Sequence, residues 1–454
     1  MELKRRISFL LLIFIVFFGI IILRLFDLQV IHHRFYQEKS LGQRTRIINR
    51  AANRGDILDC RGEILATSID TYSVFTHLPA GQAGKNGFSW LVRKADFPEA
   101  ERLRAQNPSE IFFLKEKKRV YPKGNLASQV IGFVGLDNQG LSGVELSWDK
   151  YLKGETGRVI TEGDPTGREL YGALREVEPG SDGMNLTLTI DGNVQYVAER
   201  EIAEQIKKSR AASGMLIVMR AKTGEILALA SKQDFDPNDY AKSLPRLWHP
   251  RFLDPYEPGS TFKVITTAAG LEEKVITLDT KLRALDQIEV GGRIIENSHP
   301  VRWPGPEISI SKMLEESINT GVVQIGLKLG PEKFYRRIRK FGFGEETDFG
   351  MEGESPGIVR HWENWYKPDI GMMTFGQSIA VTPLQLLSAV SAFANDGKII
   401  KPYLVKKIES ADGKFVKTFA RQERGQAVSE RTASDMKELL RNVVLKGSGR
   451  RARM

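Results

Sequence analysis

A serine and a lysine three residues apart are the strongest sign of chemistry in this sequence. Ser260 follows Pro258 and Gly259, which break the preceding segment, and an apolar, helix-compatible run begins at Phe262. This arrangement predicts that Ser260 lies at a helix N-terminus, with Lys263 one turn later on the same face. A serine hydroxyl needs a neighbouring base to become a nucleophile, and a lysine can be that base when burial lowers its pKa. The positive end of the helix dipole would also favour a developing oxyanion.

The Ser-x-x-Lys spacing alone is weak evidence, because it occurs three more times in the chain, at Ser147/Lys150, Ser309/Lys312 and Ser434/Lys437. The copy at Ser260 differs from these in two ways. It has the Pro-Gly break before an apolar helix, and a second polar group follows at Ser317-Ile318-Asn319. Taken in isolation, Ser317 and Asn319 could be a helix N-cap and a loop amide. Beside the Ser260 motif, we interpret them as members of a catalytic centre.

Composition and charge exclude several classes of protein. The chain has 454 residues, which predicts two or three domains, and its 41% hydrophobic and 27% charged residues argue against wholesale disorder. The net charge of +10 is scattered and carries no nucleic-acid-binding motif, so an anionic membrane surface or lipid-linked substrate fits better than nucleic acid. Cys60 is the single cysteine, so no intrachain disulfide can form, and the six histidines lack metal-ligand spacing. We expect no metal and no cofactor.

The N-terminal segment has the pattern of a membrane anchor. Residues 7–23 are apolar and carry no charge, and Lys4, Arg5 and Arg6 precede them. The positive-inside tendency then places the N-terminus in the cytoplasm. No small-residue cleavage site follows the run, which argues against a removed signal peptide. The alternative of a buried core helix is disfavoured, because no later segment is comparably apolar. We expect a single-pass helix, with the rest of the chain outside the cytoplasm.

Patterning divides the chain into an anchor at 1–31, a region at 32–183 and a larger domain at 184–454. The middle region is rich in turns, with two short strands expected at 53–59 and 61–66 and a loop at 80–85, which is typical of a spacer or docking module. The larger domain should be mixed α/β. Its expected elements are strands at 185–191, 215–219 and 225–230 and helices at 193–209, 311–316, 320–329, 331–341, 383–395 and 431–446.

The chain resembles the class B penicillin-binding proteins, most closely the division-specific type. The residues that carry the resemblance run in order along nearly the whole chain. They are Arg24-Leu25 and Leu28-Gln29 after the anchor, Arg54-Gly55-x-Ile57-x-Asp59, Tyr121-Pro122-x-Gly124, Gly140-x-x-Gly143-x-Glu145, Thr223-Gly224-Glu225-Ile226-Leu227-Ala228, Glu257-Pro258-Gly259-Ser260-Thr261-Phe262-Lys263, Ser317-x-Asn319-Thr320 and Phe375-Gly376-Gln377. Each is weak by itself, but in this order they are specific.

The resemblance implies an α+β fold: a transmembrane helix, a mostly β or irregular pedestal, and a mixed α/β penicillin-recognising domain that lacks its last strands. It implies a peptidoglycan D,D-transpeptidase that cross-links stem peptides ending in D-Ala-D-Ala and is acylated by β-lactams. Ser260 would be the nucleophile and Lys263 its base. Ser317 would relay protons, and Asn319 would hold Lys263 and the substrate amide. Substrate-binding residues would be Thr320, Gly376 and Gln377. A membrane glycan polymerase would be the partner, by analogy alone.

Three departures from the family pattern qualify this interpretation. Cys60-Arg61 replaces the usual Arg-Asn, and Ser378 stands where a glycine is usual. The third motif, Lys-Thr-Gly on a strand beside the nucleophile, should follow the 431–446 helix, and the sequence reaches Met454 without it. We therefore expect an incomplete transpeptidase, and we interpret the upstream Lys222-Thr223-Gly224 as a hairpin turn. A non-catalytic membrane-anchored partner remains an alternative. A β-lactamase is less favoured, because it explains neither pedestal nor anchor.

Overall fold

The computed structural model describes residues 2–50, 52–77, 88–106, 111–162, 176–232 and 234–453. The loop expected at 80–85 lies outside these ranges. The chain divides into two compact units. The first comprises Met1–Ala52 and Glu155–Ser181, and the second comprises Asn53–Gly154 and Asp182–Met454. Each unit is considered by itself below.

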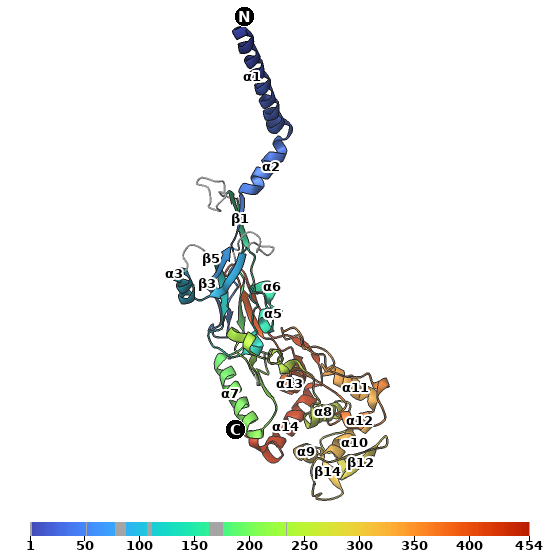
Figure 1. Cartoon of the computed structure of the whole chain (residues 1–454). Coiled ribbons are helices and arrows are strands. Elements are labelled where there is room, and N and C mark those ends of the chain that lie inside the picture. Colours follow the sequence, from blue (N-terminus) through green and yellow to red (C-terminus); the bar gives the residue numbers. More distant parts are fainter. Residues whose placement is uncertain are drawn as a thin grey trace. The chain divides into compact units, whose positions relative to one another are not determined.

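The first unit carries the long apolar helix α1 (Glu2–Phe26), drawn in dark blue in Figure 1. A π-helical turn (Asp27–Ile31) and a second helix, α2 (His33–Arg44), follow it. Over Leu3–Ile31 the mean hydropathy reaches 3.0, and no residue of that apolar window is buried in protein. A core helix would be covered by other elements, so this exposure argues against the core alternative and is consistent with a single-pass membrane anchor. The unit also holds an antiparallel sheet of β1 (Thr45–Arg50), β6 (Gly157–Glu162) and β7 (Glu176–Glu178).

The second unit is built on a seven-stranded sheet that draws on distant parts of the chain. Its strand order is β17-β16-β8-β2-β3-β4, with β5 paired to β3. The strands expected at 53–59 and 61–66 are confirmed as the antiparallel pair β2 and β3, although β2 is shorter and β3 much longer than expected. β2 also runs parallel to β8, so one sheet joins residues 57–120 to the segments at 185–188 and 405–418. The bounds are β2 Ile57–Leu58, β3 Ile64–His77, β4 Phe88–Ala95, β5 Ile111–Val120, β8 Asn185–Leu188, β16 Val405–Glu409 and β17 Val416–Thr418.

A buried charged cluster lies beside this sheet and joins three stretches that the sequence presents separately. Glu145 is fully buried and binds Arg54 Nε at 2.6 Å and Arg119 Nε at 2.7 Å. Arg54 also pairs with Asp149 at 2.6 Å. The hydroxyl of Tyr121 donates to Glu145 at 3.4 Å, and burial followed by the charge of Glu145 raises the Tyr121 pKa. Glu145 and Asp149 lie on the short helices α5 (Gly143–Ser147) and α6 (Asp149–Leu152).

Most of the helices of the larger domain fall where the apolar periodicity predicts them. Helix α7 (Gly192–Ser209) covers the β9–β10 hairpin (Gly214–Met219 and Ile226–Lys232), whose two strands are antiparallel. The five helices expected between residues 311 and 446 are all present. They are α9 Ile310–Glu315, α10 Asn319–Leu329, α11 Pro331–Lys340, α13 Pro383–Ser391 with a 3₁₀ turn to Asn395, and α14 Glu430–Lys446.

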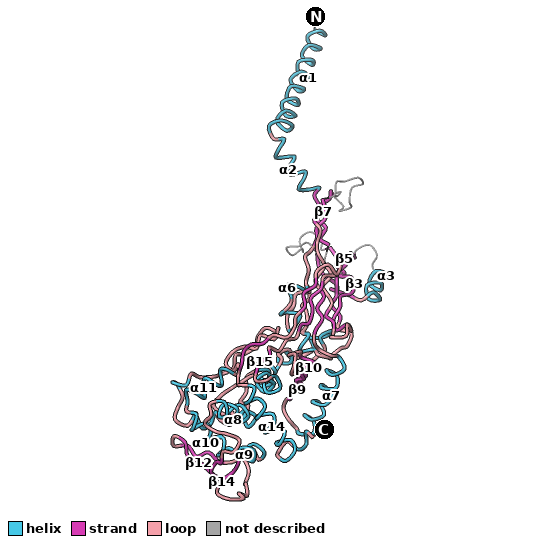
Figure 2. Tube along the Cα trace, turned by 180° about the vertical axis from the view of Figure 1, so that it is seen from behind, coloured by secondary structure: helices cyan, strands magenta, loops and turns pink. Residues whose placement is uncertain are grey.

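A large apolar core forms around α8 (Lys263–Glu272), which packs against α10 and α14. Figures 1 and 2 both place α8, α10 and α14 together with β12 and β14, away from β3 and β5. The remaining elements complete this unit. They are α3 Phe97–Gln106, α4 Ser128–Ile131, α12 Asp369–Met373, β11 Lys281–Arg283, β12 Gln287–Val290, β13 Arg293–Glu296, β14 Glu307–Ser309, β15 Lys398–Ile400 and β18 Glu423–Gln426. The mixed α+β class is therefore confirmed.

Candidate active site

Ser260 lies in a 3₁₀ turn, Gly259–Phe262, that runs directly into α8. Pro258 precedes the turn, and the side chain of Phe262 is fully buried in the helical core, which fixes the turn. Ser260 itself is exposed. The predicted placement of Ser260 at a helix N-terminus, with Lys263 one turn on, is therefore confirmed.

Lys263 directly follows this turn as the first residue of α8, and its side-chain amine is buried. Only 1% of the residue is exposed, and its Nζ donates to Ser317 O at 2.5 Å and to Ser317 Oγ at 2.9 Å. Burial disfavours the charged ammonium and lowers the pKa of Lys263 to about 7. An amine with that pKa is substantially neutral near neutral pH, so it can accept a proton from a hydroxyl.

Ser317 sits in the short connection between α9 and α10 with a left-handed backbone, at φ +54°. This conformation is unfavourable for a residue other than glycine, and it persists where the surroundings hold it in place. The N–H of Ser317 donates to Leu314 O at 3.1 Å, and its carbonyl and hydroxyl both accept from Lys263. The structure thus brings Lys263 and Ser317 together. Within the described ranges, Ser260 Oγ makes no hydrogen bond to either, and catalytic contacts of this kind often tighten only when substrate binds.

Asn319 and Thr320, at the start of α10, are tied to the hairpin β12–β13. Asn319 Nδ2 donates to Glu296 O at 2.8 Å. Thr320 is fully buried, and its hydroxyl donates to Leu285 O at 2.7 Å while its N–H donates to Asn297 Oδ1 at 3.1 Å. In the described part of the chain, Asn319 makes no hydrogen bond to Lys263, and it is Ser317 that holds the amine. The roles of Asn319 and Thr320 toward substrate stay predictions, and the contacts of Thr320 favour a positioning role.

The loop at Gly376-Gln377 packs directly against the turn that carries the nucleophile. Gly259 N–H donates to Gly376 O at 3.1 Å. Gly376 has φ +78°, and a Cβ at this position would lie 2.3 Å from Gly259 O. The close approach therefore requires a glycine. The side chain of Gln377 is exposed beside this contact, and its role in substrate binding stays a prediction.

The variant Gly376→Ala is expected to slow acylation of Ser260 about 100-fold, because the added methyl group must push the nucleophile's turn out of place. Gly342→Ala is the matched control. Gly342 has a similar φ of +87°, but a Cβ there would meet no atom within 4 Å. Both variants should therefore carry the same backbone strain, and only Gly376→Ala should lower the rate of labelling by a fluorescent penicillin. Equal rates for the two variants would contradict the packing argument.

The sequence analysis assigned no role to three residues that hold the site. Asn297 orients Thr320, Glu296 accepts from Asn319, and Glu257 Oε1 accepts from Ser378 N–H at 2.9 Å. Asn297 and Glu296 have no local motif, so no signal in a single sequence could have singled them out. Glu257 lies inside the quoted motif, but its partner is more than a hundred residues away along the chain.

The other matches to catalytic spacings have structural roles. Ser147 Oγ donates to Gly143 O at 3.0 Å, and Ser309 caps α9 by accepting from Lys312 N–H at 3.2 Å. Ser434 lies within α14. In the turn of the β9–β10 hairpin, Lys222 contacts the carbonyl of Ala394, and Thr223 Oγ1 donates to Glu225 at 2.9 Å. Among the described contacts, none of these residues bonds to Ser260 or Lys263.

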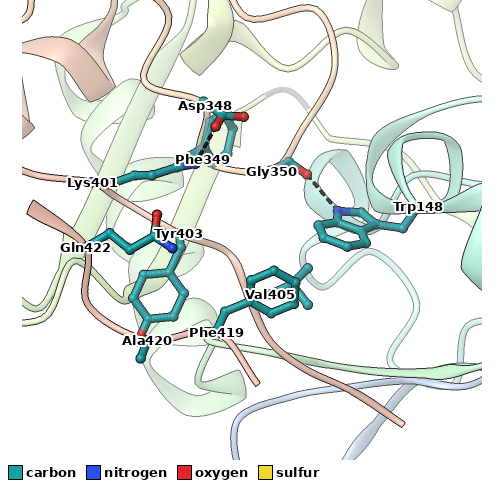
Figure 3. A pocket seen from close by; sticks show the side chains of 10 residues that line it. All are labelled: Trp148, Asp348, Phe349, Gly350, Lys401, Tyr403, Val405, Phe419, Ala420 and Gln422. Carbon is teal, nitrogen blue, oxygen red and sulfur yellow. Dashed lines mark hydrogen bonds and ion pairs between the residues drawn. The ribbon is translucent and has the colours of Figure 1, made fainter. Parts of the chain in front are cut away.

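A separate cavity of about 210 Å³ is lined by Trp148, the 348–350 loop and residues from the segments 401–405 and 419–422. Figure 3 shows its aromatic lining and the bond from Trp148 Nε1 to Gly350 O, which measures 2.7 Å. Lys401 pairs with Asp348 at one end of the cavity. None of the predicted site residues lines it, so it is distinct from the candidate active site.

Comparison with family models matches two parts of the chain. Residues 214–454 match the penicillin binding protein transpeptidase domain, and residues 89–188 match the penicillin-binding protein dimerisation domain. The first match covers Ser260, Lys263, Ser317 and the 376–377 loop.

Comparisons with individual proteins agree. The chain is 32% identical to stage V sporulation protein D of Bacillus subtilis, over 97% of this chain and 74% of that protein. It is 29% identical to the probable peptidoglycan D,D-transpeptidase PenA of Neisseria meningitidis, over 93% of this chain and 78% of that protein. Among solved structures, penicillin binding protein 3 of Mycobacterium tuberculosis in complex with ampicillin matches with a TM-score of 0.71 and 26% identity. That match covers 90% of this chain and 79% of the other.

Proposed function

The chain belongs to the class B penicillin-binding proteins, the peptidoglycan D,D-transpeptidases, and on that premise we propose that Ser260 is its nucleophile and Lys263 its base. The observation that carries the proposal is the buried amine of Lys263, which lies one turn after an exposed serine at the start of α8 and is hydrogen-bonded to Ser317 Oγ at 2.9 Å. A buried lysine with a pKa near 7 has the protonation state that activation of a hydroxyl requires.

In the first half-reaction, Lys263 Nζ takes the proton of Ser260 Oγ as that oxygen attacks the carbonyl carbon of the penultimate D-alanine of a stem peptide. The tetrahedral intermediate collapses with cleavage of the C–N bond, and the terminal D-alanine leaves as an amine. The proton for this amine passes from Lys263 through the hydroxyl of Ser317, which the 2.9 Å contact places next to it. The helix N-terminus at Ser260 favours the developing negative charge.

In the second half-reaction, an amine of a neighbouring stem peptide attacks the Ser260 ester and forms the cross-link. Its proton returns to the oxygen of Ser260, so the enzyme is regenerated. Asn319 and Gln377 contact the donor peptide, and the buried Thr320 and Gly376 hold these two residues in place. Asn319 follows Ser317 by two residues at the start of α10, and the Gly376-Gln377 loop packs against the Ser260 turn.

We propose further that the chain acts in septal wall synthesis, with α1 spanning the cytoplasmic membrane and Lys4, Arg5 and Arg6 on the cytoplasmic side. The exposed apolar surface of α1 and the basic residues at its N-terminal end support this orientation. A glycan polymerase in the same membrane would be the partner of this helix and the pedestal, which suits an enzyme whose substrate is a newly made glycan strand.

The deciding experiment is reaction of the full chain in detergent with a fluorescent penicillin, followed by digestion and mass spectrometry. A stable adduct on the peptide that contains Ser260, together with release of D-alanine from a pentapeptide substrate, is the expected result. Folded protein that forms no adduct would favour the alternative of a non-catalytic membrane-anchored partner. Rapid release of hydrolysed penicillin would identify a β-lactamase instead.

A further inference from the structure

We propose that Glu257 is a positioning residue for Ser260, and that it acts by holding the backbone N–H of Ser378. This inference rests on the proposed function of Ser260. Glu257 lies three residues before Ser260. Its Oε1 accepts from Ser378 N–H at 2.9 Å and so reaches from the nucleophile's segment to the loop that follows Gln377.

The bond between Glu257 and Ser378 is one of several contacts between the segment 256–259 and the segment 376–381, and it lies between two backbone contacts. At one end, Tyr256 and Val381 exchange backbone hydrogen bonds of 3.0 and 2.9 Å. At the other end, Gly259 N–H donates to Gly376 O at 3.1 Å. Glu257 supplies a side-chain contact between these two backbone contacts.

The geometry of Ser378 shows why the loop needs this tie. Ser378 has a left-handed backbone with φ +59°, which is unfavourable for a residue other than glycine. A strained residue keeps such a conformation only when its surroundings hold it. A hydrogen bond from Ser378 N–H to a carboxylate is charge-assisted and therefore among the stronger kinds. The bond from Glu257 thus offsets the strain at Ser378.

Loss of the bond between Glu257 and Ser378 would affect the position of Ser260 through Gly376. If Ser378 relaxed to an ordinary backbone conformation, the peptide units at 376–378 would turn, and Gly376 O would move from Gly259 N–H. That carbonyl contacts the residue just before Ser260, at an approach so close that no Cβ fits. Loss of the Glu257 bond should therefore shift Ser260 and change the position of the Gln377 side chain relative to the substrate. Overall stability should change little, because both Glu257 and its bond to Ser378 are solvent-exposed.

The test compares the second-order rate of acylation by a fluorescent penicillin in the full chain. Glu257→Ala should lower this rate by about 10- to 100-fold with an unchanged melting temperature, because a small displacement of a nucleophile is costly in rate. Glu257→Gln should stay close to wild type, because the amide oxygen still accepts the Ser378 N–H. The pH midpoint of acylation should remain near that of Lys263 in both, because Glu257 acts on position and not on the amine. Glu346→Ala, which removes another exposed carboxylate, is the control and should leave the rate unchanged.

A double variant separates positioning from any general effect. Ser378→Gly removes the strain that the Glu257 bond offsets, so Glu257→Ala/Ser378→Gly should recover part of the lost rate. Wild-type rates in Glu257→Ala, equal losses in the Ala and Gln variants, or no recovery in the double variant would each overturn the proposal. Absence of acylation in the wild-type chain would instead overturn the function of Ser260 itself, so the two failures are distinguishable.

Discussion

Replacing Lys263 with methionine is expected to slow acylation of Ser260 by a β-lactam by about 10²- to 10⁴-fold, the usual contribution of a positioned general base. Methionine fills much of the same buried volume and has no amine, so Ser260 would have to lose its proton to water. The loss also removes the donor that holds both oxygens of Ser317. The measurement is the rate of covalent labelling, with Ser260→Ala as the blank.

The sequence offers a matched control for this variant. Lys437 stands three residues after Ser434 with the same spacing, but it is an exposed residue on α14. Lys437→Met should therefore label at the wild-type rate. If Lys263→Met also labelled at the wild-type rate, the assignment of Lys263 as the base would be wrong, whatever became of Ser260.

The same amine predicts how activity and stability depend on pH. The pKa of Lys263 is lowered from 10.5 to about 7 by burial, so the neutral amine disappears below about pH 7. Acylation should rise with pH through that value and level off above it. In the unfolded chain the amine keeps its ordinary pKa, so between about pH 7 and 10.5 the unfolded state binds more protons than the folded one. The contribution of Lys263 to folding stability therefore becomes more favourable as pH rises across this window. A rate profile with no inflection near 7 in the wild type would contradict this account.

Local patterns in the sequence were sufficient to predict the parts of the site that depend on neighbours in the chain. The break at Pro258-Gly259 and the apolar run after Phe262 place Ser260 and Lys263 one turn apart, as observed. The helices α10 and α14 follow from apolar periodicity in the same way. These features depend on residues within one or two turns, and such interactions can be read from a single sequence.

What the sequence could not predict depends on residues far apart along the chain. The parallel pairing of β2 with β8 joins residues 57 and 186, and no local pattern indicates that register. The depressed pKa of Lys263 depends on how deeply the core covers it. The left-handed backbone conformations of Ser317 and Ser378 could not be predicted either, because serine rarely adopts a positive φ. Contacts of this kind are set by tertiary packing.

The largest effect on stability is expected at Glu145, whose replacement by alanine should lower the free energy of unfolding by about 3–5 kcal/mol. The variant leaves two buried guanidinium groups, of Arg54 and Arg119, without the carboxylate that each of them binds. Among the described residues, Nη2 of Arg119 is buried and has no hydrogen-bond partner, so this guanidinium is already incompletely satisfied. Asp149 still pairs with Arg54, so Arg119 should be the residue that loses its place.

Urea denaturation followed by tryptophan fluorescence measures the effect, and Glu201→Ala is the matched control. Glu201 also pairs with an arginine, Arg200, at 2.6 Å, but both side chains are about half exposed, so its loss should cost less than about 1 kcal/mol. Similar losses in the free energy of unfolding for the two variants would mean that the buried cluster does not hold the pedestal segments together.

The cluster joins strand β5, helix α5 and the chain before β2, and that chain continues through the β2–β8 pairing into the domain that carries Ser260. Loss of Glu145 should therefore reduce the amount of folded, acylation-competent protein at elevated temperature, while the acylation rate of the molecules that stay folded is unchanged.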